Sequence, residues 1–236
     1  GYGNGESNQT SKKQKLKFRP SRAVFLWYNL FMAYFEYGKT EMDFLSAADE
    51  NMRRLIENTG HIYRKTYDDL FQCVASSIAG QQISGKALET VWRRLTGLCG
   101  GEVTAEKVAE LLPGEIKSCG MSMKKAAWIK SFADALAGGK FDADSVAGMS
   151  DGDVVAALSA FDGIGQWTAE MALIFALKRP DVFSYGDLGI RKGLMKLIGS
   201  ESIDRKIFEV YRKKFSPYGT VASFYLWALA SGDAVI

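Results

Sequence analysis

The chain has 236 residues, 47% of them hydrophobic and 24% charged, with a formal net charge of +3. These fractions are those of an ordinary soluble protein that can bury a substantial core in one domain or two. A single histidine, His61, and three widely spaced cysteines argue against a zinc site, a histidine-based catalytic dyad and a disulfide framework.

The N-terminal part of the sequence is basic and is not expected to enter a membrane. Residues 1–22 have six Lys or Arg and one Glu, and residues 1–20 have the composition of a disordered segment. No signal peptide is evident, and the longest apolar stretch, residues 23–35, is too short to span a bilayer. The unpaired cysteines indicate a reducing compartment, the cytoplasm or the nucleus. The protein is expected to be a monomer.

From about Arg22 onward, the pattern is typical of helices separated by short turns, and strand hairpin signals are almost absent. Two helices, with Thr104 and Ser150 as N-caps, are predicted over residues 104–112 and 150–158. The other predicted helices cover residues 68–95 (with a break at 80–84), 124–136, 166–177, 188–198, 202–215 and 221–231. The predicted fold class is therefore all-α, as one compact unit with two helical lobes.

Residues 161–165, Phe-Asp-Gly-Ile-Gly, form a turn between two of these helices. Two glycines permit backbone conformations that a Cβ would forbid, and they leave amide N–H groups uncovered at the start of the next helix. Such amides bind phosphate, with help from the helix dipole. The alternative is a tight helix–helix turn that only packs, with Ile164 as its core anchor.

Basic residues are concentrated in residues 178–220, which contain ten Lys or Arg and five Asp or Glu. Outside residues 1–22 the chain is slightly acidic, so net charge alone does not indicate nucleic-acid binding. The local excess indicates either a solvated helix face or a surface that faces phosphates.

Four segments in a fixed order resemble one family. Residues 161–169, FDGIGQWTA, and 181–190, DVFSYGDLGI, are similar to helix-hairpin-helix (HhH-GPD) DNA glycosylases, most of all to the alkylpurine (3-methyladenine) DNA glycosylase II branch. Residues 78–84, IAGQQIS, and 119–126, CGMSMKKA, support the resemblance, which spans about residues 32–232. It implies a two-lobed helical fold with the active site in the cleft between the lobes, and damaged double-stranded DNA as partner.

The resemblance also implies how the hairpin is used. A phosphate of the lesion strand would be held by three residues of the hairpin, Gly163, Gly165 and Thr168. A structural Na⁺ or K⁺ could bridge to that phosphate from three backbone carbonyls, those of Ser159, Phe161 and Ile164. No other cofactor is expected, because the Cys quartet of relatives with an iron–sulfur cluster is missing.

Asp187 is the catalytic residue that the resemblance implies. Cleavage of an N-glycosidic bond develops oxocarbenium character on the sugar, and a carboxylate beside it stabilises that charge and can orient or deprotonate water. The local sequence alone favours an N-cap of the following helix, and the two roles are compatible. Gly186 stands where some relatives have a second acid, which leaves one carboxylate.

Trp167 indicates the type of reaction. Relatives that also cut the strand have a Lys at this position, which attacks the sugar to form a Schiff base. An indole cannot do this, so the sequence predicts a monofunctional glycosylase that leaves an intact strand with an abasic site.

The base pocket is expected to have aromatic walls, because a flipped purine that carries a positive charge is attracted to electron-rich rings. The candidates are Trp167, Trp227 and Tyr218, although Trp227 could equally belong to the core. Met171 stands where some relatives have Tyr, which puts the lesion range in doubt.

Gln82 is the candidate wedge that fills the gap left by the flipped base, or else an exposed loop residue, and Lys86 is a candidate phosphate contact. The expected N-terminal extension, residues 1–31, matches nothing in the family, and no N-terminal β domain is expected. It is either a basic tail with affinity for DNA or an extension outside the natural protein. Two other functions stay open: a glycosylase for deaminated or mismatched bases, and a helix-hairpin-helix module that binds DNA without catalysis.

Overall fold

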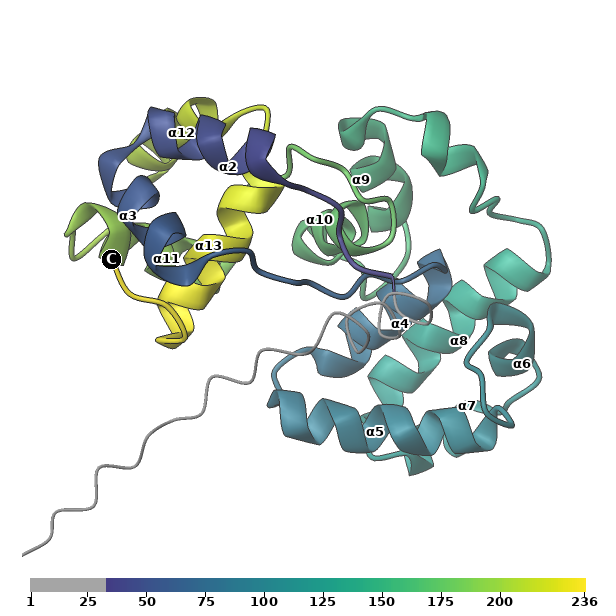
Figure 1. Ribbon diagram of the computed structural model, residues 1–236. Helices are drawn as coiled ribbons and strands as arrows, with labels where there is room; N and C mark the ends of the chain where they lie inside the picture. The colour runs from purple at the N-terminus through teal and green to yellow at the C-terminus, as the bar shows by residue number, and fades with distance from the viewer. Residues whose placement is uncertain (1–32) are drawn as a thin grey trace, which may run out of the picture. The chain divides into compact units, whose positions relative to one another are not determined.

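The computed structural model describes residues 33–236 (Figure 1). Within this range it has twelve α-helices and one short 3-10 helix. The range contains no β-strand, only an isolated β-bridge between Tyr34 and Lys65. The predicted all-α class is confirmed, whereas the expected extension over residues 1–31 lies outside the described residues. No helix within residues 33–236 has both the length and the apolar character needed to cross a bilayer.

One set of helices, here called the terminal group, combines both ends of the described chain (Figure 1). It consists of α2 (Lys39–Ala48), α3 (Glu50–Thr59), α11 (Leu188–Ile198), α12 (Arg205–Phe215) and α13 (Gly219–Ser231). The helix α13 is buried along most of its length and packs closely on α11. A Cβ at Gly193 would lie 2.1 Å from the carbonyl oxygen of Leu226, so glycine is required where these two backbones meet.

The other set, here called the central group, lies between these ends in the sequence. It consists of α4 (Leu70–Gly80), α5 (Gly85–Leu98), α6 (Ala105–Ala109), α7 (Pro113–Ser118), α8 (Met123–Ala137), η1 (Ser145–Gly148), α9 (Asp151–Ser159) and α10 (Gln166–Phe175). The apolar helix α4 contacts α5, α8 and α10 and forms the centre of this group. The two groups correspond to the two lobes expected from the sequence.

Most helix boundaries agree with the sequence predictions. The hydroxyl of Thr104 accepts a hydrogen bond from the amide of Lys107 at 3.3 Å, so it is the predicted N-cap of α6. The same holds for Ser150 at the start of α9. The helix α12 begins at Arg205, three residues later than expected, because Asp204 is its N-cap. The short helix α7, which starts with Pro113 at its first position, was not predicted.

Candidate active site

Three N–H groups converge on the carboxylate of Asp187, at the start of α11. Oδ1 accepts hydrogen bonds from the amide of Ile190 at 2.8 Å and from the indole Nε1 of Trp227 at 2.9 Å. Oδ2 accepts one from the indole Nε1 of Trp167 at 2.7 Å. The bond from Ile190 makes Asp187 the N-cap of α11, as its local sequence indicates. The two indole bonds are additional and fix the orientation of the carboxylate.

The donors to Asp187 come from both helix groups. Trp167 lies in the first turn of α10, in the central group, and Trp227 lies on α13, in the terminal group. Only 7% of the surface of Asp187 is exposed, so its polar atoms depend on these protein partners more than on water. The carboxylate therefore lies where the two groups meet.

Gly189 makes room for the indole of Trp227. A Cβ at this position would lie 2.7 Å from Cδ1 of Trp227 and 3.1 Å from Oδ1 of Asp187. The ring of Trp227 also stacks on Phe175 and Phe224, with centroid distances of 5.9 and 6.0 Å. Trp227 thus packs against the core and also donates to Asp187, while its role as a wall of the base pocket stays a prediction.

The other pocket candidates are placed differently. Trp167 is 37% exposed, so its ring is accessible to a ligand, while Met171, one turn further along α10, is buried. Tyr218 packs edge-to-face on Phe44 at the beginning of α13. It is nine residues from Trp227, about 13 Å along a helix axis. The structure therefore brings Trp167 and Trp227 together at Asp187 and places Tyr218 at the other end of α13.

The glycine turn between α9 and α10 has the open backbone that its sequence indicates. Gly163 has a φ of +83°, and a Cβ there would lie 2.4 Å from the ring of Trp128, so glycine is needed on both counts. Ile164 is buried and anchors the turn. Within residues 33–236 the amides of Gly163 and Gly165 have no backbone hydrogen bond, and the first α-helical bond runs from Ala169 to Gly165 at 3.0 Å. The free amides thus lie at the N-terminus of α10.

The carbonyl oxygens near this turn differ in how they are used. That of Phe161 accepts the amide of Ile164 at 3.1 Å, which leaves it one lone pair. That of Gly163 accepts the side-chain amide of Gln81 at 3.0 Å. Ser159 is the last residue of α9, where carbonyls lack partners within the helix. The carbonyl set of Ser159, Phe161 and Ile164 is therefore compatible with a monovalent cation.

The loop between α4 and α5 is tied to the hairpin by residues whose roles the sequence did not reveal. Gln81 binds the carbonyl of Gly163, as described above. The ammonium of Lys125 donates to the carbonyls of Ala79 and Gln81 at 3.0 and 2.5 Å, and burial lowers the pKa of Lys125. Gln82, the wedge candidate, is exposed and has a φ of +58°, uncommon for a residue with a Cβ. The contacts of Gln81 and Lys125 thus hold the loop in place, and Gln82 projects from it into solvent.

Lys86 is exposed in the first turn of α5, just after this loop. Both Gln81 and Lys125 lie inside the motifs that carry the family resemblance, and this position could have marked them as residues of the site. Trp128, which packs under Gly163, lies two residues beyond these motifs, so the sequence did not indicate its role.

Comparisons with known proteins agree on one family. The model of the HhH-GPD superfamily of base excision DNA repair proteins matches residues 75–217. The chain is 32% identical over 195 residues to DNA-3-methyladenine glycosylase 1 of Schizosaccharomyces pombe, covering 78% of this chain and 83% of the relative. It is also 32% identical over 202 residues to the DNA-3-methyladenine glycosylase of Saccharomyces cerevisiae, covering 70% and 68%.

Solved structures show the same similarity. The crystal structure of a DNA-3-methyladenine glycosidase from Bacillus halodurans is 34% identical with a TM-score of 0.72, and the match covers 84% of this chain and 93% of that one. The Schizosaccharomyces pombe 3-methyladenine DNA glycosylase in complex with abasic DNA is 28% identical with a TM-score of 0.73, and the match covers 80% and 96%.

Proposed function

The chain belongs to the HhH-GPD superfamily of base excision DNA repair proteins, and from this premise we infer its reaction. It is a DNA glycosylase that hydrolyses the N-glycosidic bond of alkylated purines such as 3-methyladenine in double-stranded DNA. We propose 7-methylguanine as a second substrate, and we expect the protein in the compartment that holds the DNA. The observation that carries the mechanism is the carboxylate of Asp187 between two indole N–H groups.

Asp187 is proposed to act mainly through its charge. When the bond between sugar and base breaks, positive charge develops on the sugar, and a fixed carboxylate in a site with little water stabilises it strongly. The bond from Trp167 takes one lone pair of Oδ2 and holds the carboxylate in place, while the other lone pair stays free to face the sugar. Because only 7% of Asp187 is exposed, water has little access to it, and this favours electrostatic stabilisation over general-base catalysis.

Trp167 is proposed as the main wall for the flipped base. Its ring is partly exposed beside Asp187, and an indole face attracts a positively charged purine more strongly than a neutral one. An alkylated purine that is already cationic leaves readily, so the reaction needs no general acid. Met171 would form the buried floor of the pocket. Tyr218 is a weaker candidate for the pocket, because it lies at the other end of α13.

The DNA backbone is proposed to bind at the hairpin. Amides of Gly163 and Gly165, with the nearby Thr168 and the dipole of α10, would hold a phosphate of the lesion strand. A Na⁺ or K⁺ held by the carbonyls of three residues, Ser159, Phe161 and Ile164, would add positive charge there. Gln82 would enter the duplex as the wedge, and Lys86 would contact a phosphate beyond it.

A product analysis tests this function. Duplex DNA treated with a methylating agent is incubated with the protein, and free 3-methyladenine, free 7-methylguanine and abasic sites are measured. We expect both free bases, together with strands that stay intact until alkali is added, because Trp167 supplies no amine for a Schiff base. Strand scission without alkali would contradict the monofunctional reaction. Release of hypoxanthine from a control duplex, with no release of methylated bases, would contradict the substrate class.

A further inference from the structure

A second cationic feature lies on the terminal group, next to Asp187 in the sequence. The guanidinium carbons of Arg191 and Arg205 lie 5.3 and 5.1 Å from the ring centroid of Tyr185. Tyr185 stands two residues before Asp187, and Arg191 stands four residues after it on α11. Arg205 is the first residue of α12. The loop before Asp187 and the beginnings of two helices therefore meet at one aromatic ring.

The positive charge at this ring is poorly balanced by acidic groups. Within residues 33–236, Arg191 forms no ion pair, and its Nε is buried without a hydrogen-bond partner. Arg205 has an ion pair with Glu209 at 3.7 Å, which is exposed and longer than a hydrogen bond. Two guanidinium groups beside one ring repel each other, and an anion between them would relieve that repulsion.

The basic residues of 178–220 divide into two sets with different surroundings. Five of the ten bind named acceptors in the fold: Lys178, Arg179, Lys196, Arg212 and Lys214. Four of the other five lie in the first two turns of α11 and α12: Arg191, Lys192, Arg205 and Lys206. A cation in the first turn of a helix is opposed by the helix dipole, so the positions of Arg205 and Lys206 do not favour stability. A role in binding anions explains them better than a solvated helix face does.

We propose that Tyr185, Arg191 and Arg205 form a second phosphate site, which lies on the terminal group and is separate from the hairpin of the central group. This inference rests on the proposed glycosylase function. The hairpin belongs to the central group and reaches Asp187 through Trp167, whereas Arg191 and Arg205 lie on α11 and α12 of the terminal group. Each helix group would therefore bind a phosphate of the DNA near the reacting nucleotide. The ring of Tyr185 orients the guanidinium planes, which bind phosphate oxygens in pairs.

The salt dependence of DNA binding tests this site. The binding constant for a duplex with a tetrahydrofuran abasic-site analogue is measured between 50 and 200 mM KCl by fluorescence anisotropy. Each phosphate contact contributes about 0.9 to the slope of log K against log salt. We expect the Arg191→Gln/Arg205→Gln double variant to lose about 0.9 of slope. Over this range wild type then loses about threefold more affinity than the variant.

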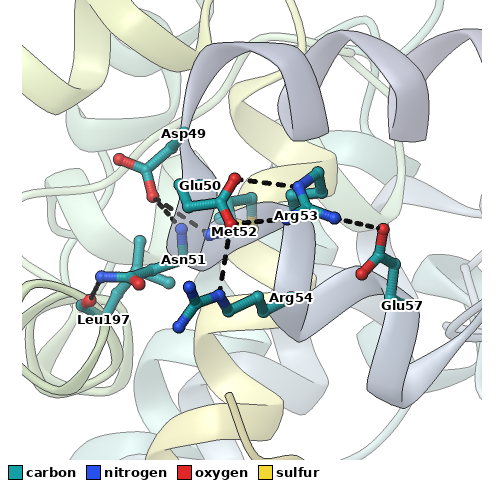
Figure 2. A network of polar contacts seen from close by, with 8 residues as sticks. All are labelled: Asp49, Glu50, Asn51, Met52, Arg53, Arg54, Glu57 and Leu197. Atoms are coloured by element: carbon teal, nitrogen blue, oxygen red, sulfur yellow. Dashed lines mark hydrogen bonds and ion pairs between the residues drawn. The ribbon is translucent and has the colours of Figure 1, made fainter.

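Matched variants separate a phosphate contact from a general effect of charge. Arg53→Gln, on α3, removes a guanidinium that is already paired with Glu50 and Glu57, so its slope should equal that of wild type (Figure 2). Arg191→Lys/Arg205→Lys keeps both charges and should keep most of the slope. Arg205→Gln alone, at an exposed position, tests the site even if substitution of Arg191 impairs folding.

The outcomes distinguish this site from the proposed function. An unchanged slope in the folded Gln double variant, or in Arg205→Gln if the double variant does not fold, overturns the second phosphate site whether or not bases are released. A reduced slope in a protein whose wild type releases no methylated base would retain the phosphate site for DNA binding and overturn the glycosylase function. Release of methylated bases by wild type with a reduced slope in the Gln variant supports both.

Discussion

The polar network around Asp187 and the polar network along α3 have very different surroundings. Asp187 is 7% exposed, and its two indole donors come from α10 and α13. On α3, Glu50, Arg53 and Glu57 have side chains that are 57%, 41% and 58% exposed, and all of them belong to one helix (Figure 2). Water can replace the partners of the second network but has little access to the first.

This difference shows which polar contacts position a functional group. The ion pairs between Glu50, Arg53 and Glu57 join residues three and four apart and support only their own helix. The two indole bonds to Asp187 join distant parts of the chain and fix one carboxylate. Even within Figure 2, the contact of wider consequence is that of Asn51, whose side chain donates to the carbonyl of Leu197 on α11 at 2.8 Å.

The largest effect is expected from removal of the charge at the buried network. Asp187→Asn should lower the rate of base release from methylated duplex DNA by about 10² to 10³-fold under single-turnover conditions, because it removes electrostatic stabilisation from the transition state. Its thermal unfolding midpoint should fall modestly, since Asn keeps the N-cap but its amide nitrogen cannot accept the bond from Trp167. A rate within threefold of wild type would show that Asp187 is only a cap.

A smaller loss of rate is expected from removal of one indole donor. Trp227→Phe keeps a ring to stack on Phe175 and Phe224 but removes the N–H bond to Asp187. A hydrogen bond to a charged group is worth about 1.5 kcal/mol or more, so the single-turnover rate should fall about tenfold. The dissociation constant for abasic DNA should not change. Weaker binding with an unchanged rate would instead identify Trp227 as a DNA contact.

The hairpin should be sensitive at one glycine and tolerant at the other. Gly163→Ala forces a Cβ into Trp128 at a φ of +83°, and it should lower the free energy of unfolding by about 1 to 3 kcal/mol. Gly165→Ala is the control, because nothing lies within 4 Å of a Cβ there. Urea unfolding of both variants measures the difference. Equal stabilities would contradict the packing of the turn on Trp128.

The smallest effect is expected in the exposed network. Arg53→Gln breaks the ion pairs with Glu50 and Glu57, yet exposed pairs on one helix contribute little, and the free energy of unfolding should change by less than about 1 kcal/mol. Urea unfolding at low and high salt measures this change in the free energy of unfolding. A loss of 3 kcal/mol would show that the exposed network contributes as much to stability as a buried one, which contradicts the difference described above.

The sequence predicted the helices best where caps are unambiguous. The bounds of α11 follow from Asp187 at its start and from Gly199 at its end, where the glycine adopts a left-handed conformation. The start of α12 was placed three residues too early, at Ser202, because the capping role of Asp204, which accepts the amide of Ile207, was not recognised. The helix α7 is too short for an apolar period to be visible.

For the site, the motifs predicted which residues matter but not how they contact each other. The cap by Asp187 is local and could be foreseen, whereas its bond to Trp227 spans 40 residues and depends on the approach of α11 to α13. Likewise, nothing in the sequence indicates that Gln81 turns toward the carbonyl of Gly163, 82 residues away. The direction of a side chain is set by packing that no local pattern encodes.

A double-mutant cycle tests most directly the claim that Asp187 and its indole donors act as one unit. Single-turnover rates of base release are measured for wild type, Asp187→Asn, Trp227→Phe and the double variant. If Trp227 acts by positioning the carboxylate, its roughly tenfold effect should nearly vanish in the Asp187→Asn background. If the two losses instead multiply, Trp227 acts independently of Asp187, and this account of the site is wrong.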